Sequence, residues 1–351
     1  MSTRALLLAL AVVHGSFAAA QVRNPKGTKP TMGDGGCYVS GFPHDMSFVP
    51  GAVTTNTFVT TGDPELRKFL VYVPSDYATR TAPLPVVYMV HGTGQTAQAI
   101  MHNTTWRHAA EFFGFIAVYP EALPYLLLDG TTVTKWATDS VEEFVVDPSE
   151  LPMADDVLFL RELHNTLIMH LDVDCRRVYA SGFSNGGAFV KTELRVELAD
   201  VFAATSSAGG IGVGNGLPGE YMPANGTDFR PHYELVGTRD DKKIDNCIST
   251  GDLMPGDILP RRVADVVALP CMWDPLLLFA EAMGQDPSVY ATVEDPDYTE
   301  FLWNSTLLPG PGPTEYRFRI LPGMIHEYPS GTNHPIDYVP ILWAWMEQYR
   351  R

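Results

Sequence analysis

Several features that define other protein classes are missing from this 351-residue chain. No stretch approaches the ~18 uninterrupted apolar residues of a membrane-spanning helix, and no long repeat, Walker A sequence or HExxH motif occurs. Basic residues are scarce, because 24 Lys and Arg stand against 41 Asp and Glu, a formal charge of −17. This negative charge repels nucleic-acid backbones and anionic membrane surfaces, which are also negative. We therefore expect no nucleic-acid or membrane partner, and nothing indicates a cofactor or a metal ion.

The first twenty residues have the layout of a secretory signal peptide. Arg4 precedes an apolar run over 5–13, and small residues follow at Ala18, Ala19 and Ala20. The apolar run is too short to cross a bilayer core of roughly 30 Å, so a signal anchor is the lesser alternative. We expect cleavage near Ala20 and a secreted, extracellular protein.

Cysteine is also sparse, and its number fits secretion. The four cysteines, none in a CxxC motif, favour two disulfides in an oxidising compartment, and three pairings are possible. Of these we favour Cys247 with Cys271 and Cys37 with Cys175. Three Asn-x-Ser/Thr sequons are predicted glycosylation sites: Asn103, Asn225 and Asn304.

With 45% hydrophobic residues the chain can fill a sizeable core. An irregular arm is expected over 21–65. Beyond it, short runs that are apolar on both faces alternate with amphipathic stretches. This alternation predicts an α/β domain over 66–351 with a mostly parallel, twisted sheet and helices on both faces. An insertion or lid is expected over 241–275. The expected strands are 69–73, 86–90, 115–119, 177–181, 202–206, 233–236 and 316–321, and the expected helices are 106–113, 155–171, 187–198 and 335–349.

The sharpest motif is Gly182-Phe183-Ser184-Asn185-Gly186. It follows an expected strand and precedes an expected helix, as in the G-x-S-x-G turn that exposes a nucleophilic serine. Ser184 is therefore the candidate nucleophile, and the backbone N–H of Asn185 is a candidate donor to an oxyanion. The second donor is expected from Thr93, in the glycine-containing loop that follows the strand over 86–90. His91 beside it is expected to hold this loop.

A serine nucleophile needs a histidine base and an acid, which in this chain order follow the serine. His326 comes directly after the last expected strand and is the preferred base, with His334 as the fallback. Asp240 follows the strand over 233–236 and is the preferred acid, although Asp241 stays open as the alternative.

In their order along the chain these segments resemble a known family. The matching stretches are 36–37, 67–74, 85–95, 155–174, 177–187, 237–240 and 323–326. They are similar to the secreted feruloyl and acetylxylan esterases of carbohydrate esterase family 1 and to polyhydroxybutyrate-depolymerase-like esterases, which implies an α/β-hydrolase fold. The stretches 241–275 and 295–313 match nothing in that family, and Val236-Gly237 stands where the family often has His-Gly.

The resemblance implies a secreted serine carboxylester hydrolase that needs no cofactor. Its expected substrate is an ester on an extracellular polymer, with feruloyl or acetyl esters of the plant cell-wall polysaccharide xylan favoured over a polyester such as polyhydroxybutyrate. A hypothesis from another class is a catalytically silent, α/β-hydrolase-like binding or adhesion protein. We expect a monomer by default.

Overall fold

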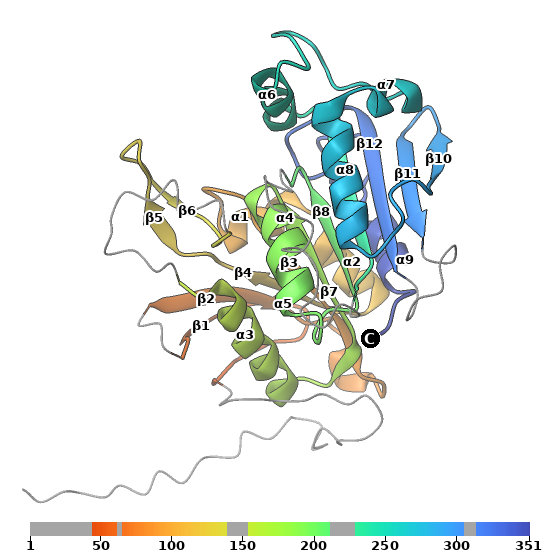
Figure 1. Ribbon diagram of the computed structural model, residues 1–351. Coiled ribbons are helices and arrows are strands. Elements are labelled where there is room, and N and C mark those ends of the chain that lie inside the picture. Colours follow the sequence, from red (N-terminus) through yellow and green to blue (C-terminus); the bar gives the residue numbers. More distant parts are fainter. Residues whose placement is uncertain (1–43, 62–64, 139–153, 211–228, 305–313) are drawn as a thin grey trace, which may run out of the picture.

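The computed structural model describes residues 44–61, 65–138, 154–210, 229–304 and 314–351, and it shows a ten-stranded sheet with helices packed on both faces (Figure 1). In sheet order the strands are β1 Val53–Val59, β2 Leu66–Tyr72, β4 Ile116–Pro120, β3 Leu84–Val90, β7 Val173–Phe183, β8 Ala204–Ala208, β9 His232–Arg239, β12 Glu315–Ile325, β11 Thr299–Asn304 and β10 Ala291–Glu294.

The middle of the sheet is parallel and both ends are antiparallel. Strands β4, β3, β7, β8, β9 and β12 pair in parallel, whereas β2 pairs with β4 and β11 with β12 in the opposite sense. A separate hairpin consists of β5 Pro124–Leu126 and β6 Thr132–Thr134. The prediction of a mostly parallel sheet is confirmed.

The helices connect these strands. They are α1 Ala97–Asn103, α2 Trp106–Phe113, α3 Asp156–His170, α4 Asn185–Phe189, α5 Arg195–Glu197, α6 Asp241–Ser249, α7 Val263–Val267, α8 Pro270–Ala282 and α9 Val339–Met346, with a 3-10 turn at Tyr77–Thr79. Among the described residues, no helix combines the length and the apolar character that crossing a membrane requires.

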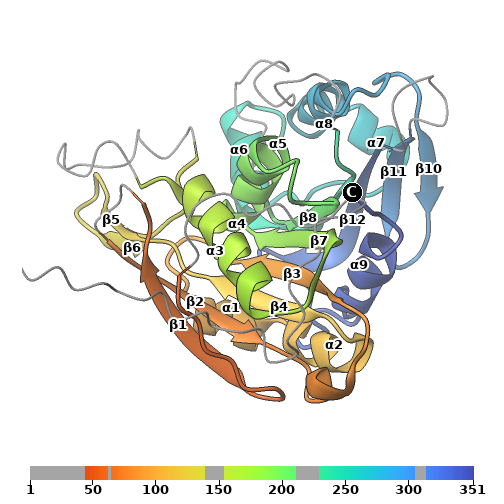
Figure 2. The ribbon, with the colours of Figure 1, turned by 90° about the horizontal axis from the view of Figure 1, so that it is seen from below.

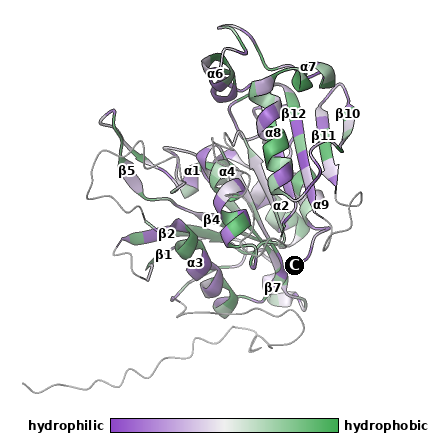
Figure 3. Ribbon diagram, viewed as in Figure 1, coloured by the Kyte–Doolittle hydropathy of each residue, from purple (hydrophilic) through white to green (hydrophobic). Residues whose placement is uncertain are grey.

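Alternate residues of the central strands face two separate cores. On β3, Val86, Tyr88 and Val90 pack into the cluster under α3 and α4, whereas Val87 and Met89 pack into the cluster under α1, α2 and α9. All five are buried, which explains why the strand is apolar on both faces. Figure 2 shows the sheet between these two helical layers, and both hydrophilic and hydrophobic residues occur along α3 and α8 in Figure 3.

The range expected as an insertion or lid, 241–275, is largely helical. It contains α6, α7 and the start of α8, which continues to Ala282, beyond the expected boundary. Their apolar side chains join β9, β11 and β12 in a third core that includes Phe279, Trp303 and Phe318. This segment is therefore a packed layer over one end of the sheet, and the sequence obscured it because Pro, Gly and Asp lie between the short helices.

The range expected as an irregular arm, 21–65, contains a strand. Residues 21–43 and 62–64 lie outside the described part, but β1 pairs antiparallel with β2 over its whole length. Asn56 and Phe58 are buried on one face while Thr55 and Thr57 are exposed on the other. This period-two pattern is that of an edge strand with one solvated face.

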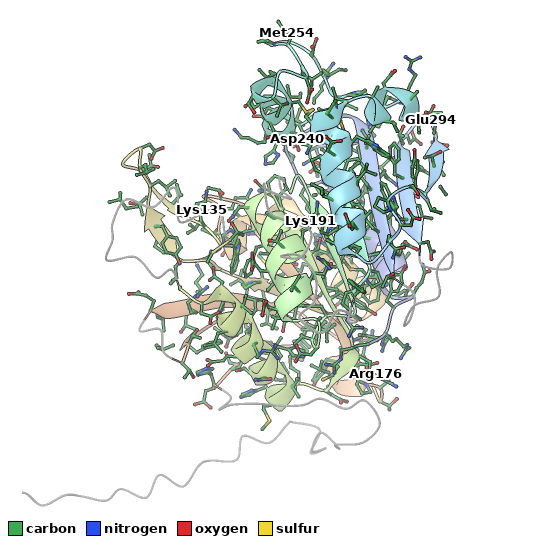
Figure 4. The ribbon with its side chains drawn as sticks, viewed as in Figure 1. Lys135, Arg176, Lys191, Asp240, Met254 and Glu294 are labelled. Carbon is green, nitrogen blue, oxygen red and sulfur yellow. A yellow bond between two sulfur atoms is a disulfide. The ribbon has the colours of Figure 1, made fainter. Side chains whose placement is uncertain are left out.

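The helix expected over 187–198 is not uniform. It begins at Asn185 and widens into a π-helical turn at Val190–Leu194 between α4 and α5. The turn carries the buried Lys191, whose ammonium group donates to Glu234 on β9 at 2.8 Å. Figure 4 labels Lys191 on this helix.

Candidate active site

Ser184 lies at the sharp turn between β7 and α4. Its φ of 53° and ψ of −122° make it the one non-glycine residue with positive φ in the described part of the chain. A Cβ on Gly182 would lie 2.2 Å from the carbonyl oxygen of Gly186, and one on Gly186 would lie 2.2 Å from that of His91. The turn therefore requires glycine two residues before and two after Ser184, as the motif predicts.

The structure brings together the three residues of the predicted triad. His326, at the end of β12, has its Nε2 2.8 Å from Ser184 Oγ and its Nδ1 2.9 Å from Asp240 Oδ1. Because a carboxylate only accepts, Nδ1–H donates to Asp240, which leaves Nε2 free to accept the Ser184 proton. The fallback base His334 instead bonds the backbone of Ile336.

Of the two candidate acids, Asp240 faces the histidine. It follows β9, is fully buried and is the N-cap of α6, where Oδ1 also accepts the N–H of Lys243 at 3.2 Å. Asp241 has a side chain that is 63% exposed and pairs with Lys242 at 3.7 Å. Figure 4 labels Asp240 below α6. The candidate acid is thus held in place by the first turn of a helix.

Helix α6 is itself anchored. Cys247 near its end forms a disulfide with Cys271 at the start of α8, so the predicted pairing of these two residues is observed. Cys37 lies outside the described residues, and its pairing with Cys175 stays a prediction. The bridge connects the helix that carries the acid to the third core.

The loop after β3 presents one uncommitted N–H. The amides of Gly92, Gly94 and Gln95 donate to Gln95 Oε1, to Thr134 O and to Gly92 O. Among the described residues, the amide of Thr93 has no hydrogen-bond partner. A Cβ on Gly92 would lie 3.0 Å from Ser184 Cβ, so the loop and the serine are in close contact. Asn185 is the first residue of α4, so its N–H and that of Thr93 remain the candidate donors to an oxyanion.

His91 holds this loop from beneath, as the sequence suggested. It is fully buried, its Nε2 accepts the N–H of Ala122 at 3.0 Å, and its Nδ1–H donates to Gly92 O at 2.8 Å. Burial lowers the pKa of His91 to about 4. A neutral imidazole with both nitrogens engaged is a structural group here.

Trp136 connects the side chain of Asn185 to His91 directly after β3, and sequence reasoning missed it. Its N–H donates to Asn185 Oδ1 at 2.8 Å, and its indole N–H donates to the carbonyl of His91 at 2.9 Å. Its ring also stacks on Phe189 of α4 at 5.2 Å. Because these partners lie 45 or more residues away, no local pattern in the sequence could reveal the contact.

Tyr328 was also missed, and it braces the histidine loop. Its hydroxyl accepts the indole N–H of Trp106 at 2.9 Å and lies 2.9 Å from Ser181 Oγ, which in turn accepts from Ser206 Oγ at 2.8 Å. Burial raises the pKa of Tyr328, so the phenol stays protonated. Ser181 precedes the nucleophile on β7, and the chain of bonds therefore links the strand of Ser184 to the loop of His326.

A cavity of ≈ 460 Å³ lies next to His326. One wall comes from α1 and the preceding loop, and the other comes from the segment after β12. The lining is mostly polar, with aromatic side chains beside the histidine; it consists of Gln95, Ile100, His102, Asn103, Phe183, His326, Glu327, Tyr328, Thr332 and Asn333.

The triad shares two residues with the one cluster of metal-ligating groups in the described ranges. The ligand atoms of Asp240, Asp241 and His326 lie within 4.8 Å of one another. Both ring nitrogens of His326 are already engaged with Ser184 and Asp240. The arrangement therefore fits proton transfer and not metal binding.

Two of the three predicted glycosylation sites can be placed. Asn103 is exposed at the end of α1, and Asn304 is half-buried at the end of β11. Asn225 lies outside the described residues. Glycosylation itself stays a prediction at all three.

Comparison with known proteins supports both the fold and the resemblance. No family model matches the chain. It is 25% identical over 175 residues to a bifunctional acetylxylan esterase/xylanase of Neocallimastix patriciarum, covering 50% of this chain and 22% of the relative. It is 27% identical over 153 residues to feruloyl esterase B of Neurospora crassa, covering 42% and 46%. The chain thus spans less than half the length of these two curated relatives.

A solved structure extends the similarity to most of the chain. The acetyl xylan esterase from Aspergillus awamori superposes with a TM-score of 0.52 at 15% identity, covering 84% of this chain and 99% of that one. At this identity the superposition shows the fold alone. The predicted α/β-hydrolase fold is confirmed, as is the predicted similarity to acetylxylan and feruloyl esterases.

Proposed function

We propose that the protein is a serine carboxylester hydrolase. The observation that carries this proposal is the continuous chain of hydrogen bonds from Ser184 Oγ through both ring nitrogens of His326 to the buried Asp240. A serine hydroxyl is a weak nucleophile until an adjacent base takes its proton. Here the base is within hydrogen-bond distance and held in the tautomer that can accept.

The reaction proceeds in two halves. Ser184 Oγ attacks the ester carbonyl carbon while His326 Nε2 takes its proton, and the N–H groups of Thr93 and Asn185 stabilise the oxyanion. The intermediate collapses as the bond to the leaving alcohol breaks, and His326 protonates that alcohol. Water then repeats the sequence on the acyl-enzyme, which releases the acid and restores Ser184.

Asp240 stabilises the protonated form of His326. Its carboxylate is fully buried and 2.9 Å from Nδ1, so the interaction with an imidazolium is only weakly screened. The same contact fixes the ring orientation. The chemistry uses side chains and backbone amides, and it needs no cofactor.

The substrates that we propose are acetyl or feruloyl esters on an extracellular polysaccharide of the xylan type. The names of the two curated relatives support this class. The cavity beside His326 supports it too, because His326 protonates the leaving alcohol and the lining side chains His102, Asn103, Thr332 and Asn333 can hydrogen-bond a hydroxyl-rich alcohol.

We also propose that the protein is secreted. The support is the signal-peptide layout of the first twenty residues and the Cys247–Cys271 disulfide, a bond that persists in oxidising compartments. A polymeric substrate outside the cell requires such a location.

The test combines a covalent probe with a substrate panel. A fluorophosphonate should label the wild-type protein and not Ser184→Ala, and catalytic efficiency should be highest on acetylated xylan or methyl ferulate within a panel that includes 4-nitrophenyl esters and amorphous polyhydroxybutyrate. Folded protein that neither reacts with the probe nor hydrolyses any ester would overturn the proposal in favour of a binding protein. Preference for the polyester would overturn the substrate class alone.

A further inference from the structure

Asn103 combines a glycosylation sequon with a place beside the catalytic histidine. It is the last residue of α1, it is exposed, and Thr104 and Thr105 complete the sequon. Its side-chain amide makes no hydrogen bond to any described residue. The nitrogen to which a glycan would attach is therefore uncommitted.

The same residue lines the cavity that contains His326. Asn103 and His102 form part of one wall, and Thr332 and Asn333 belong to the other. A group attached to Asn103 consequently stands at the entrance for the leaving alcohol.

The two walls are braced against each other, which fixes Asn103 relative to His326. Thr105 Oγ1 donates to Asp337 at 2.7 Å, and the indole of Trp106 donates to Tyr328 at 2.9 Å. Both bonds join the start of α2 to the segment that follows His326. A glycan could not be accommodated simply by moving α1 away from the histidine loop.

Asn304 provides a natural contrast within the same chain. It ends β11, the second strand from one end of the sheet, whereas α1 packs on β2, β3 and β4 toward the other end. Asn304 does not line the cavity. A glycan there should leave the site unaffected.

We propose that Asn103 carries an N-linked glycan that partly closes the leaving-alcohol cavity, so that the glycosylated enzyme hydrolyses esters of bulky, polymeric alcohols more slowly than the trimmed enzyme does, whereas esters of small alcohols are unaffected. This inference rests on the proposed secretion and ester hydrolysis. In the attachment step, Asn103 Nδ2 forms a bond to C1 of the first sugar and loses a proton, while the bond from C1 to its lipid-pyrophosphate carrier breaks and the pyrophosphate leaves.

The fold also sets when the step occurs. The hydroxyl of Thr105, the third sequon residue, is bonded to Asp337, which lies 232 positions later in the chain. Attachment therefore precedes the packing of the C-terminal segment on α2, during or soon after translocation.

The experiment uses full-length protein secreted from a eukaryotic host. Peptide mass spectrometry should find the Asn103 peptide glycosylated. An endoglycosidase that leaves a single sugar should then raise kcat/KM on acetylated xylan by about tenfold, the lower end of what one added or removed group changes at a binding pocket. For 4-nitrophenyl acetate, kcat/KM should change by less than about twofold on trimming, because its small leaving alcohol does not reach the glycan.

Two variants separate the glycan from the side chain. Asn103→Gln from the same host should match the trimmed wild type, and Asn304→Gln should match the untrimmed one. In bacteria, which add no such glycan, Asn103→Gln should differ from wild type in kcat/KM on acetylated xylan by much less than the tenfold effect of trimming, because glutamine keeps the amide; a difference as large as that of trimming would assign the effect to the asparagine itself and overturn the proposal.

The remaining outcomes are equally decisive. An unmodified Asn103 in an active enzyme, or an equal effect of trimming on both esters, would overturn the inference and leave the proposed function standing. An occupied Asn103 in a protein that hydrolyses no ester would overturn both.

Discussion

Replacing Asp240 with asparagine tests the triad most directly, because it removes one charge and preserves the shape of the side chain. In the native structure Oδ1 accepts from His326 Nδ1–H at 2.9 Å and from Lys243 N–H at 3.2 Å. The Lys243 amide should hold the oxygen of the variant's side chain in the same place. His326 would then keep its tautomer, and what the variant loses is the charge that stabilises the imidazolium.

The size of that loss follows from the geometry. Two unit charges about 4 Å apart interact by about 4 kcal/mol at an effective dielectric constant near 20, which corresponds to about a thousandfold decrease in kcat. An amide turned with its nitrogen toward His326 would impose the wrong tautomer and bring the decrease to about ten-thousandfold, the effect of the same replacement in a serine-protease triad. We therefore expect kcat to fall by about 10³ to 10⁴ in Asp240→Asn.

The assay is steady-state hydrolysis of 4-nitrophenyl acetate together with the rate of fluorophosphonate labelling. Asp241→Asn is the matched control, because its exposed carboxylate pairs only loosely with Lys242, and its activity should stay within about twofold. Asparagine caps a helix as well as aspartate does, so both variants should stay folded, although Asp240→Asn should melt at a lower temperature because the buried position of Oδ2 offers its amide N–H groups no acceptor. A crippled Asp241→Asn beside an active Asp240→Asn would refute the assignment.

Three further perturbations have defined outcomes. Tyr328→Phe should lower the free energy of unfolding in urea by about 1–3 kcal/mol, since the buried indole N–H of Trp106 loses its acceptor. The same variant should lower kcat more than it changes KM, and an unchanged kcat would show that Tyr328 does not position His326. Replacing Cys247 and Cys271 by alanine should lower the free energy of unfolding by about 2–4 kcal/mol, and it should remove the part of the reductant-induced drop in melting temperature that this bridge causes. Burial holds the pKa of His91 at about 4, below 6.5, so the unfolded state binds the extra proton and the free energy of unfolding should fall by about 1.4 kcal/mol per unit as the pH drops from 6.5 toward 4. In His91→Gln this slope should be smaller by that amount, and an identical slope in urea titrations would contradict the assigned neutral state.

The parts of the fold that could be predicted from the sequence are those determined by residues close together along the chain. Strand β3 is apolar at every position because both faces are buried, and the elbow needs glycine on each side of Ser184 because any Cβ meets backbone. The chain order of a serine, an acid and a histidine then selected His326 from several candidates.

The parts that could not be predicted depend on distant contacts or have no pattern. All four residues of β10 are exposed, so no alternation marks it as a strand. The choice between Asp240 and Asp241 depends on which of them caps α6, and the sequence does not distinguish two adjacent aspartates. Trp136 and Tyr328 act through partners far along the chain, and only the folded structure brings them together.

The backbone is crowded around Ser184, so the turn that holds it does not tolerate substitution, whereas the rim of the neighbouring cavity does. At Gly182 and Gly186 even one methyl group would collide with a carbonyl, so directed evolution at those positions should yield inactive libraries. The side chains of His102 and Asn103 on one rim and Thr332 on the opposite rim reach solvent and stand apart from the proton relay. An engineer seeking a new ester preference can therefore randomise those rims while the reaction machinery stays untouched.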